Sequence, residues 1–310
     1  MAEMLPARGR RASVAPQRAS RVSSTTIVAL VASHNRRAKT LACLDSYFAQ
    51  DAGPDAALSA VLVDDASTDG TATAVQERFP GTHVIVGSGD LFWARSMAIA
   101  EVAARTYAPE YVLWLNDDVV LDQGALRRLM DTVTSASPNG CIVVGALRDP
   151  VTGEVSYSGF RRSGLNPLRV AKIQPTDRPV EIDTFAGNVV LVTRTALERV
   201  GGIDGEFEHA SADHDYGLRA ASVGVPRLLA AGTVGTCVLN PSTAPWADPA
   251  LTVRERFQVL VGSKGHPPHS RARYLRRHGG PLWPVFWVAP YVRALPSLLR
   301  RGARSFSPKT

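Results

Sequence analysis

Residues 111–118 read YVLWLNDD, an uninterrupted apolar run that ends in an acidic cluster. The run Tyr111–Leu115 is typical of a buried strand. Because burying an unpaired carboxylate is costly, we expect Asn116, Asp117 and Asp118 at the carboxyl end of this strand, where open α/β sheets face a ligand crevice. Oxygen-bearing side chains suit a hard divalent cation, and the cation in turn suits a phosphate. The stretch therefore predicts a metal-assisted reaction on a phosphorylated substrate.

The chain on both sides of this stretch alternates between strand and helix patterns. Strands are expected at Thr26–Ser33, Ala60–Val63, His83–Val86 and Tyr111–Leu115. Helices are expected at Arg36–Gln50, Thr71–Arg78, Trp93–Tyr107, Gly124–Ser135 and near Tyr216–Val223. This order predicts an α/β fold with a mostly parallel central sheet flanked by helices. After about residue 140 the pattern is less regular.

Length and cysteine usage bound the class of protein. A chain of 310 residues is long enough to bury a full hydrophobic core. Its three cysteines, Cys43, Cys141 and Cys237, lie far apart and form no CxxC pair. This spacing argues against a zinc site or a disulfide framework and fits a reducing compartment, so we expect a cytoplasmic protein.

Charge is distributed unevenly along the chain. Residues 1–24 hold five Arg and one Glu, and residues 256–310 hold eleven Lys or Arg and no acidic residue, so the segment between them has a net charge of −8 within a total of +7. An acidic middle is not typical of a general nucleic-acid binder, and no nucleic-acid partner is expected. The basic ends themselves suit anionic lipid, an anionic glycan or nucleic acid.

Polar side chains also follow the first and second expected strands. His34, Asn35 and Arg36 follow the first strand, and Asp64 and Asp65 follow the second. Because the carboxyl ends of parallel strands meet at one edge of a sheet, these residues are expected beside the cluster at 116–118. Residues 64–70 also have the composition of a helix start, and this alternative stays open.

A second acidic site lies downstream, at the start of the last expected helix. Asp213 and Asp215 flank His214 in the segment DHDYGLRA. A helix cap explains one of these carboxylates but not both. A carboxylate near a helix N-terminus stays ionised and can accept a proton.

Five ordered motifs carry a resemblance to a known family. They are VALVASHNR, VLVDDASTDGT, LWLNDDVVLDQGAL, FAGNVVLVTRTALERVGGIDGEF and DHDYGLRA. Together they resemble the family 2 inverting glycosyltransferases with the GT-A fold, over roughly residues 26–240. The segment from Gly89 to Arg95 looks most like members that handle deoxysugars such as rhamnose.

The resemblance implies roles for particular residues. Asp213 matches the general base, Asp118 and Asn116 match the two ends of the D-x-D metal-binding motif, and Gly187 and Asn188 would line the acceptor side together with Asp215. The donor-binding residues would be His34, Asn35, Arg36, Asp64, Asp65, Gly89, Trp93, Arg95, Asn116 and Asp117.

The resemblance also implies a mechanism. A nucleotide-diphosphate sugar would donate its sugar to a hydroxyl of a glycan, lipid-linked or small-molecule acceptor in one displacement, assisted by Mg²⁺ or Mn²⁺. The chain departs from the family pattern at two points. Asn116 stands at the first acidic position of the metal motif, and residues 235–241 lack the His with which many members bind metal.

These matches divide the chain into three expected parts. Residues 1–24 lack an apolar run and read as a disordered basic tail rather than a secretory signal, residues 25–245 form the GT-A catalytic domain, and residues 246–310 form a basic, aromatic and helical C-terminal extension. The extension suits peripheral contact with anionic lipid at the inner face of the membrane, packing of a helical arm on the domain, or binding of an anionic lipid-linked acceptor.

Two other functions remain open from the sequence. A sugar-nucleotide pyrophosphorylase also uses a parallel sheet, Asp residues and Mg²⁺, but it normally needs a Gly-rich loop after the first strand, where this chain has residues 34–37, HNRR. A non-catalytic protein that binds sugar nucleotides would not need Asp213.

Overall fold

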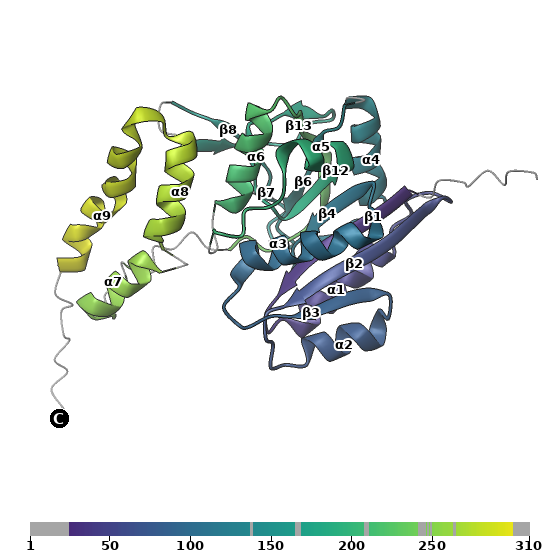
Figure 1. The fold of residues 1–310 in the computed structure, drawn as a ribbon, viewed down its shortest axis with the longest axis horizontal. Helices are drawn as coiled ribbons and strands as arrows, with labels where there is room; N and C mark the ends of the chain where they lie inside the picture. The colour runs from purple at the N-terminus through teal and green to yellow at the C-terminus, as the bar shows by residue number, and fades with distance from the viewer. Residues whose placement is uncertain are drawn as a thin grey trace, which may run out of the picture.

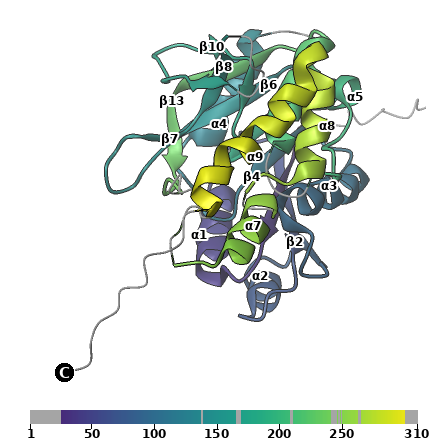
Figure 2. The same cartoon turned by 90° about the vertical axis from the view of Figure 1, so that its left-hand side faces the viewer.

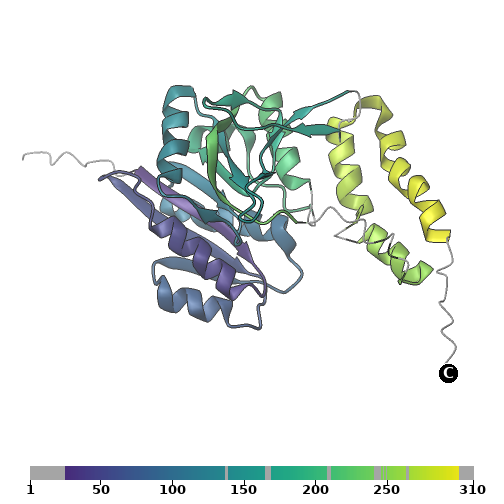
Figure 3. The ribbon, with the colours of Figure 1, turned by 180° about the vertical axis from the view of Figure 1, so that it is seen from behind.

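The computed structural model describes residues 25–136, 139–164, 169–207, 211–240, 246, 248, 250–262 and 265–299. The tail expected at residues 1–24 lies outside them. Figure 1 shows a body of strands and helices, and a group of helices at one end of it. Figure 3 shows the same arrangement from behind.

The strands form one large sheet and one small sheet. In the large sheet the order is β10-β13-β6-β12-β4-β1-β2-β3, with β5 paired to β13 and β7 paired to β6, and the small sheet has the order β11-β8-β9. The strands span Thr25–Ser33 (β1), Ala56–Asp64 (β2), Thr82–Val86 (β3), Tyr111–Leu115 (β4), Val120–Leu121 (β5), Ile142–Arg148 (β6), Val155–Tyr157 (β7), Gly159–Arg162 (β8), Val170–Lys172 (β9), Val180–Glu181 (β10), Thr184–Phe185 (β11), Val189–Thr193 (β12) and Arg227–Thr236 (β13).

The α/β class is confirmed, and the sheet is parallel in its N-terminal half. Strands β3, β2, β1 and β4 run parallel, with Ser33 level with Asp64 and Leu30 level with Trp114. Strand β12 runs antiparallel between β4 and β6, with Val189 opposite Leu115. An antiparallel strand begins at the edge where its parallel neighbours end. The residues before β12 therefore meet the residues after β1, β2 and β4.

Helices cover both faces of the sheet and form the end group. They span Arg37–Phe48 (α1), Thr71–Arg78 (α2), Phe92–Ala104 (α3), Ala125–Ala136 (α4), Arg194–Val200 (α5), Ala212–Ser222 (α6), Val253–Val261 (α7), Pro268–His278 (α8) and Trp283–Leu299 (α9), with short 3₁₀ turns at Arg105–Tyr107 and Gly280–Leu282. Helix α6 begins four residues before the expected position, so both Asp213 and Asp215 lie in its first turn.

The alternation of side chains along β1 divides the core into two layers. Ile27 and Val31 pack on one face, in a cluster that includes Leu44 of α1. Val28 and Leu30 pack on the other face, in a cluster that includes Met97 of α3. Successive residues of a strand point to opposite faces, so a strand that is apolar throughout must be covered on both. This burial holds the carboxyl ends of the strands in register.

Helices α7, α8 and α9 follow the sheet and form the end group, which Figure 2 shows facing the viewer. Tyr274 and Leu275 of α8 share a buried cluster with Phe207 and Leu218 of the body. The packing arm expected from the sequence is therefore present for this part of the extension. Within the described part of the chain, no helix combines the length and apolar character needed to cross a bilayer.

Candidate active site

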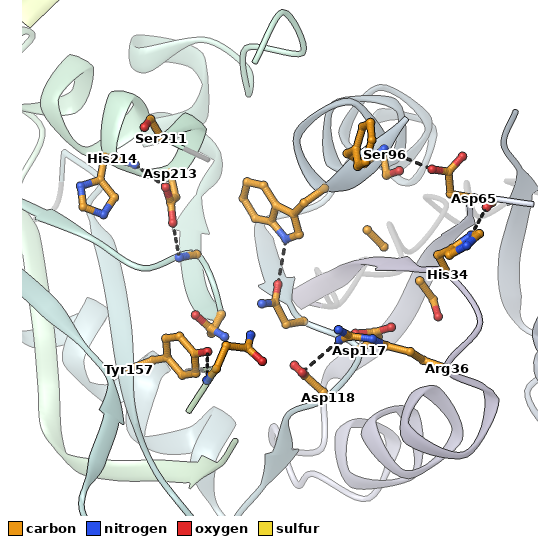
Figure 4. A pocket seen from close by; sticks show the side chains of 18 of the residues that line it. His34, Arg36, Asp65, Ser96, Asp117, Asp118, Tyr157, Ser211, Asp213 and His214 are labelled. Carbon is orange, nitrogen blue, oxygen red and sulfur yellow. Dashed lines mark hydrogen bonds and ion pairs between the residues drawn. The ribbon is translucent and has the colours of Figure 1, made fainter. Parts of the chain in front are cut away.

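A cleft of about 720 Å³ opens at the carboxyl edge of the parallel strands (Figure 4). Its walls come from the ends of β1, β2 and β4, from α3, from the start of α6 and from α8. The lining residues are Ala32, Ser33, His34, Arg36, Asp65, Gly89, Phe92, Trp93, Ser96, Asn116, Asp117, Asp118, Tyr157, Gly187, Asn188, Ser211, Asp213, His214, Asn240 and Tyr274. The structure thus brings together most residues named from the sequence.

Arg36 pairs with both carboxylates of the acidic cluster. Its Nη1 atom lies 3.1 Å from Oδ1 of Asp117 and 3.0 Å from Oδ2 of Asp118. Asp117 is buried, and this burial raises its pKa to about 6, although the Arg36 charge opposes the rise. Asp118 opens to the cleft, and its Oδ1 accepts a hydrogen bond from the Cys237 thiol at 3.4 Å. Both aspartates therefore pair with the same guanidinium nitrogen at the edge of the cleft.

Asn116 is oriented by an aromatic side chain. The Trp93 indole N–H donates to Asn116 Oδ1 at 2.8 Å, and the Trp93 ring meets Trp114 edge-on, with ring centroids 5.8 Å apart. The backbone N–H of Asn116 donates to the carbonyl of Asn188 at 3.0 Å, which ties β4 to the start of β12. The amide oxygen of Asn116 is thus engaged by Trp93.

The two aspartates after β2 have different surroundings. Asp64 is buried within its own loop, where its carboxylate accepts from the N–H groups of Ser67 at 3.2 Å and Ala72 at 3.1 Å. Asp65 lines the cleft, and its carboxylate accepts from the N–H groups of Gly89 at 2.7 Å and Leu91 at 2.9 Å. Asp65 therefore fixes the turn that leads into α3, and Asp64 closes the loop behind it.

Two other residues of the expected donor site lie away from the cleft lining. Asn35 has a left-handed backbone, and its side chain accepts from the N–H of Thr68 at 2.8 Å, which closes the neighbouring loop. Arg95 is exposed on α3. By contrast, His34 lines the cleft, with Nδ1 2.5 Å from the carbonyl oxygen of Asp65.

Asp213 faces the acidic cluster across the cleft, as Figure 4 shows. Its Oδ2 accepts from the N–H of Gly187 at 3.0 Å, and its Oδ1 accepts from the N–H of His214 at 2.8 Å. Gly187 is required here because a Cβ at this position would lie 2.8 Å from the Trp93 ring and 3.2 Å from the Asp213 Cβ. Two backbone amides thus fix the orientation of this carboxylate.

Asp215 lies outside the cleft, in a buried ion cluster. Its carboxylate contacts Arg219 at 2.8 Å, Arg277 at 3.0 Å and His278 at 2.9 Å, and its side chain has no exposed surface. Burial opposes ionisation, but the hydrogen bonds from His278 and Arg219 outweigh it and lower the pKa of Asp215 to about 2. Asp215 therefore joins α6 to α8, a placement that differs from the acceptor-side position expected from its motif.

The cleft includes residues that the motifs did not single out. Tyr157 and Tyr274 are two of them, and Tyr274 comes from α8 in the C-terminal extension. No local pattern marks either tyrosine, because each reaches the cleft through packing between distant segments. Ser211 and His214, by contrast, sit beside Asp213, and their closeness to that motif was the available signal.

The fit of a divalent cation depends on the donor set at the cluster. Among the described residues, no group of three or more His, Cys, Asp or Glu is arranged to hold a metal ion. Asp118 offers one carboxylate to the cleft, and the amide oxygen of its neighbour Asn116 is bound by Trp93. Mg²⁺ is commonly held by one or two carboxylates together with substrate phosphates. These residues therefore fit a cation in combination with a diphosphate ligand.

Comparisons with known proteins found a curated relative that matches about half of the chain. An N-acetylglucosaminyl-diphospho-decaprenol L-rhamnosyltransferase of Mycobacterium tuberculosis is 27% identical over 194 residues, which cover 54% of this chain and 62% of the relative. The aligned part is thus less than two thirds of that relative's length.

Solved structures share the fold. The mannosyltransferase PcManGT from Pyrobaculum calidifontis, in complex with GDP-Man and Mn²⁺, is similar with a TM-score of 0.52 and 21% identity, over 88% of this chain and 72% of that chain. GalNAc-T7 with UDP, GalNAc and Mn²⁺ is similar with a TM-score of 0.62 and 12% identity, over 88% of this chain and 52% of that chain. Both support the GT-A architecture expected from the motifs.

A family model spans the parallel half of the sheet and the strand that inserts beside it. Residues 28–195 of the 310 match the model described as Glycosyl transferase family 2. The match includes the loops that carry His34, Asp65, Asp118 and Gly187, and it contains fifteen of the twenty residues that line the cleft. The chain belongs to glycosyl transferase family 2.

Proposed function

We propose that the protein is an inverting glycosyltransferase that moves a sugar from a nucleotide-diphosphate donor to an acceptor hydroxyl by a single displacement. The observation that carries this proposal is the opposition of two sites across one cleft. Asp213 lies on one wall, and Arg36 with Asp118 lies on the other. A single displacement needs a base for the acceptor and positive charge for the leaving group, and it needs no enzyme nucleophile.

Asp213 is the proposed general base. Each of its carboxylate oxygens accepts one backbone N–H, from Gly187 or His214, and a carboxylate oxygen can accept a second hydrogen bond. An acceptor hydroxyl in the cleft donates to Asp213, which takes the proton as the hydroxyl oxygen attacks the anomeric carbon. The bond from that carbon to the diphosphate oxygen breaks on the opposite side, so the configuration inverts.

The leaving diphosphate is proposed to bind at the acidic cluster. Arg36 is 43% exposed at its side chain, so its guanidinium can turn from Asp118 to a phosphate while Asp117 still anchors it. Asp118, with Asn116 beside it, would hold Mg²⁺ or Mn²⁺ together with diphosphate oxygens. A cation bound there would neutralise charge that develops on the leaving group.

The nucleotide is proposed to occupy the wall formed by His34 and Asp65. Both residues line the cleft next to Gly89, and the carboxylate of Asp65 holds the turn at Gly89 in place. Asp64 and Asn35 support this wall by closing its loops. Trp93 is proposed to pack against the sugar, since its ring lies between Asn116 and Gly187.

The name of the curated relative supports a proposal for the classes of donor and acceptor. Its name states an L-rhamnosyl donor group and an N-acetylglucosaminyl-diphospho-decaprenol acceptor. We therefore propose transfer of rhamnose or a similar deoxyhexose to a lipid-linked glycan acceptor. The catalytic unit is proposed to be residues 25–245, and residues 246–310 its C-terminal extension, which adds Tyr274 to the cleft.

One variant tests the mechanism. Asp213→Asn keeps the shape of the side chain but removes the base, so transfer is expected to fall by about 10²–10⁴-fold. Nucleotide-sugar donors from a panel should still raise the melting temperature of the variant. The matched control is Asp177→Asn, an exposed aspartate outside the cleft lining, which should transfer at the wild-type rate.

The alternatives give different results in the same assays. Unchanged transfer by Asp213→Asn would contradict the proposed base. A sugar-nucleotide-binding protein without catalysis would be stabilised by donors but would transfer nothing. A pyrophosphorylase would release pyrophosphate from a nucleoside triphosphate and a sugar 1-phosphate, and we expect no such release.

A further inference from the structure

The outer side of helix α9 carries a continuous row of exposed apolar side chains. Four of them, Val285, Val288, Val292 and Leu295, belong to α9, and Leu282 ends the 3₁₀ turn just before it. All five are between 43% and 59% exposed. Their spacing of three or four residues places them on one side of a helix. We refer to these five residues as the α9 apolar stripe. The stripe extends over roughly 20 Å at 1.5 Å per residue.

Only one exposed polar residue lies within the residues that the stripe spans. Within residues 281–296, the exposed positions outside the stripe are prolines and Arg293. A helix that borders water normally carries charged and polar side chains on its outer side. Scattered single exposed valines occur elsewhere on this protein and need no explanation, but an ordered apolar row does.

The inner side of α9 already supplies its attachment to the protein. Trp283, Phe286 and Trp287 pack against the buried cluster that contains Tyr274 and Leu275 of α8. The Trp287 indole N–H also donates to the carbonyl of Pro268 at 3.0 Å. The stripe therefore stays exposed although the helix is packed against the protein. Figures 1 and 2 show α9 at the periphery of the molecule.

The neighbouring helix also carries exposed apolar side chains. Helix α7 contacts α9, and its Val253 and Phe257 are about half exposed and four residues apart. Four residues is one helical turn, so these two side chains also lie on one side of their helix. The exposed apolar side chains of the end group thus come from two helices in contact.

The charge of this region favours one kind of partner for the stripe. Residues 256–310 contain eleven Lys or Arg and no acidic residue. Arg273 and Arg277 pair with Asp204 and Asp215 of the body, and nine other Lys or Arg keep the segment strongly positive. A second copy of the chain would bring the same positive charge against it, whereas an anionic bilayer would supply the opposite charge. We infer that the α9 apolar stripe lies in the interfacial region of an anionic lipid bilayer, with the helix parallel to the membrane surface.

This orientation has a consequence for the cleft. Helix α8 contacts α9 on one side and contributes Tyr274 to the cleft on another. A bilayer that holds α9 therefore lies within one helix layer of the part of the cleft that Tyr274 lines. Membrane binding is a property of the folded chain, and it does not depend on which sugar is transferred or on whether transfer occurs.

Flotation of the full chain with lipid vesicles tests the inference. The vesicles contain phosphatidylcholine alone, or phosphatidylcholine with phosphatidylglycerol. The wild-type protein is expected to float with the anionic vesicles and much less with the neutral ones. Replacing two stripe residues, Val288→Glu with Val292→Glu, should weaken this binding by about tenfold or more, because apolar area is lost and like charge is added.

Matched variants separate the stripe from general effects. Val102→Glu and Val151→Glu place the same charge at valines that are 63% and 89% exposed elsewhere, and they should float like the wild-type protein. The milder pair Val285→Ser with Val292→Ser, which adds no charge, should give an intermediate loss. Circular dichroism and melting curves confirm that each variant is folded.

Three outcomes would overturn the inference. The first is a wild-type protein that does not float with anionic vesicles. The second is equal flotation of the wild-type protein and both stripe variants. The third is a wild-type dimer in analytical ultracentrifugation that the stripe variants dissociate and that excludes vesicle binding, since the stripe would then be an interface between copies.

Discussion

Asp213 and Asp118 lie on opposite walls of one cleft, and different kinds of groups hold them. Asp213 is held by the backbone amides of Gly187 and His214, which stay in place. Asp118 is held by the guanidinium of Arg36 and the thiol of Cys237, both of which are side chains. The proposed base is thus preorganised, and the wall proposed to bind phosphate can rearrange when a ligand arrives.

Replacing Asp118 tests the wall that would hold the cation. Asp118→Asn is expected to weaken donor binding by about tenfold or more in Mn²⁺, because the cation loses its carboxylate ligand. In EDTA the variant and the wild-type protein should bind the donor similarly. Isothermal titration calorimetry measures both conditions, with Asp131→Asn, whose side chain is 69% exposed on α4, as the control. An equal loss in Mn²⁺ and in EDTA would show that Asp118 does not act through a cation.

Gly187 is packed tightly between Trp93 and Asp213. In Gly187→Ala the new Cβ would lie 2.8 Å from the Trp93 ring, so the ring or the Asp213 carboxylate must move. We expect a loss of about 1–3 kcal/mol in the free energy of unfolding and a fall in transfer of roughly 10- to 100-fold. Gly81→Ala is the control, because no atom lies within 4 Å of the Cβ position there. Wild-type kinetics in Gly187→Ala would mean that this contact does not position the proposed base.

At the scale of elements, α6 connects the site to the C-terminal helices. Asp213 and Asp215 stand two residues apart in its first turn. Asp213 faces the cleft, and Asp215 is paired with Arg277 and His278 of α8. The turn that holds the proposed base is therefore the same turn that anchors α8.

The ionisation of Asp215 should make the stability of the protein depend on pH. Its pKa is lowered from 3.8 to about 2, so the folded state binds fewer protons than the unfolded state between these values. The stability contributed by Asp215 is then fully present above about pH 4 and is lost as the pH falls toward 2. The pH-dependent part is on the order of 2 kcal/mol.

Urea unfolding at several pH values measures this effect. Asp215→Asn is expected to be about 3 kcal/mol or more less stable than the wild-type protein near neutral pH, since it leaves Arg219, Arg277 and His278 without their common partner. The difference should shrink below pH 4. A difference that stays constant down to the lowest pH measured would contradict the role assigned to this carboxylate.

For the whole molecule, the extension and the body share a core. Phe207 and Leu218 of the body are buried in the same cluster as Tyr274 and Leu275 of α8. Phe207 has no exposed surface, so removing α8 would uncover it. The extension is therefore part of the folded unit that surrounds the cleft.

Truncation measures this shared core. A chain that ends at residue 245 is expected to melt about 10 °C or more below the full chain and to bind a hydrophobic dye. A chain that ends at Leu299, where α9 is complete, should melt like the full chain. If the chain ending at residue 245 melts unchanged, the body and the extension are energetically independent.

Local sequence predicted the first half of the fold and one wall of the site. Strand β4 was expected at the same residues that the structure shows, and Asp65 and Asp118 lie in the cleft after their strands. Apolar runs determine which segments must be buried, and the polar residues directly after a parallel strand can only lie at its carboxyl edge. The order of these strands and helices predicted the class of the fold, and five ordered motifs predicted the family.

Only the tertiary structure decided how distant segments complete the site. The antiparallel insertion of β12 brings Gly187 to Asp213, the burial of Asp215 turns that carboxylate toward α8, and the packing of α8 brings Tyr274 to the cleft. None of these placements is encoded by spacing along the chain. Each depends on contacts between segments far apart in sequence, whose burial is settled only when the whole core is packed.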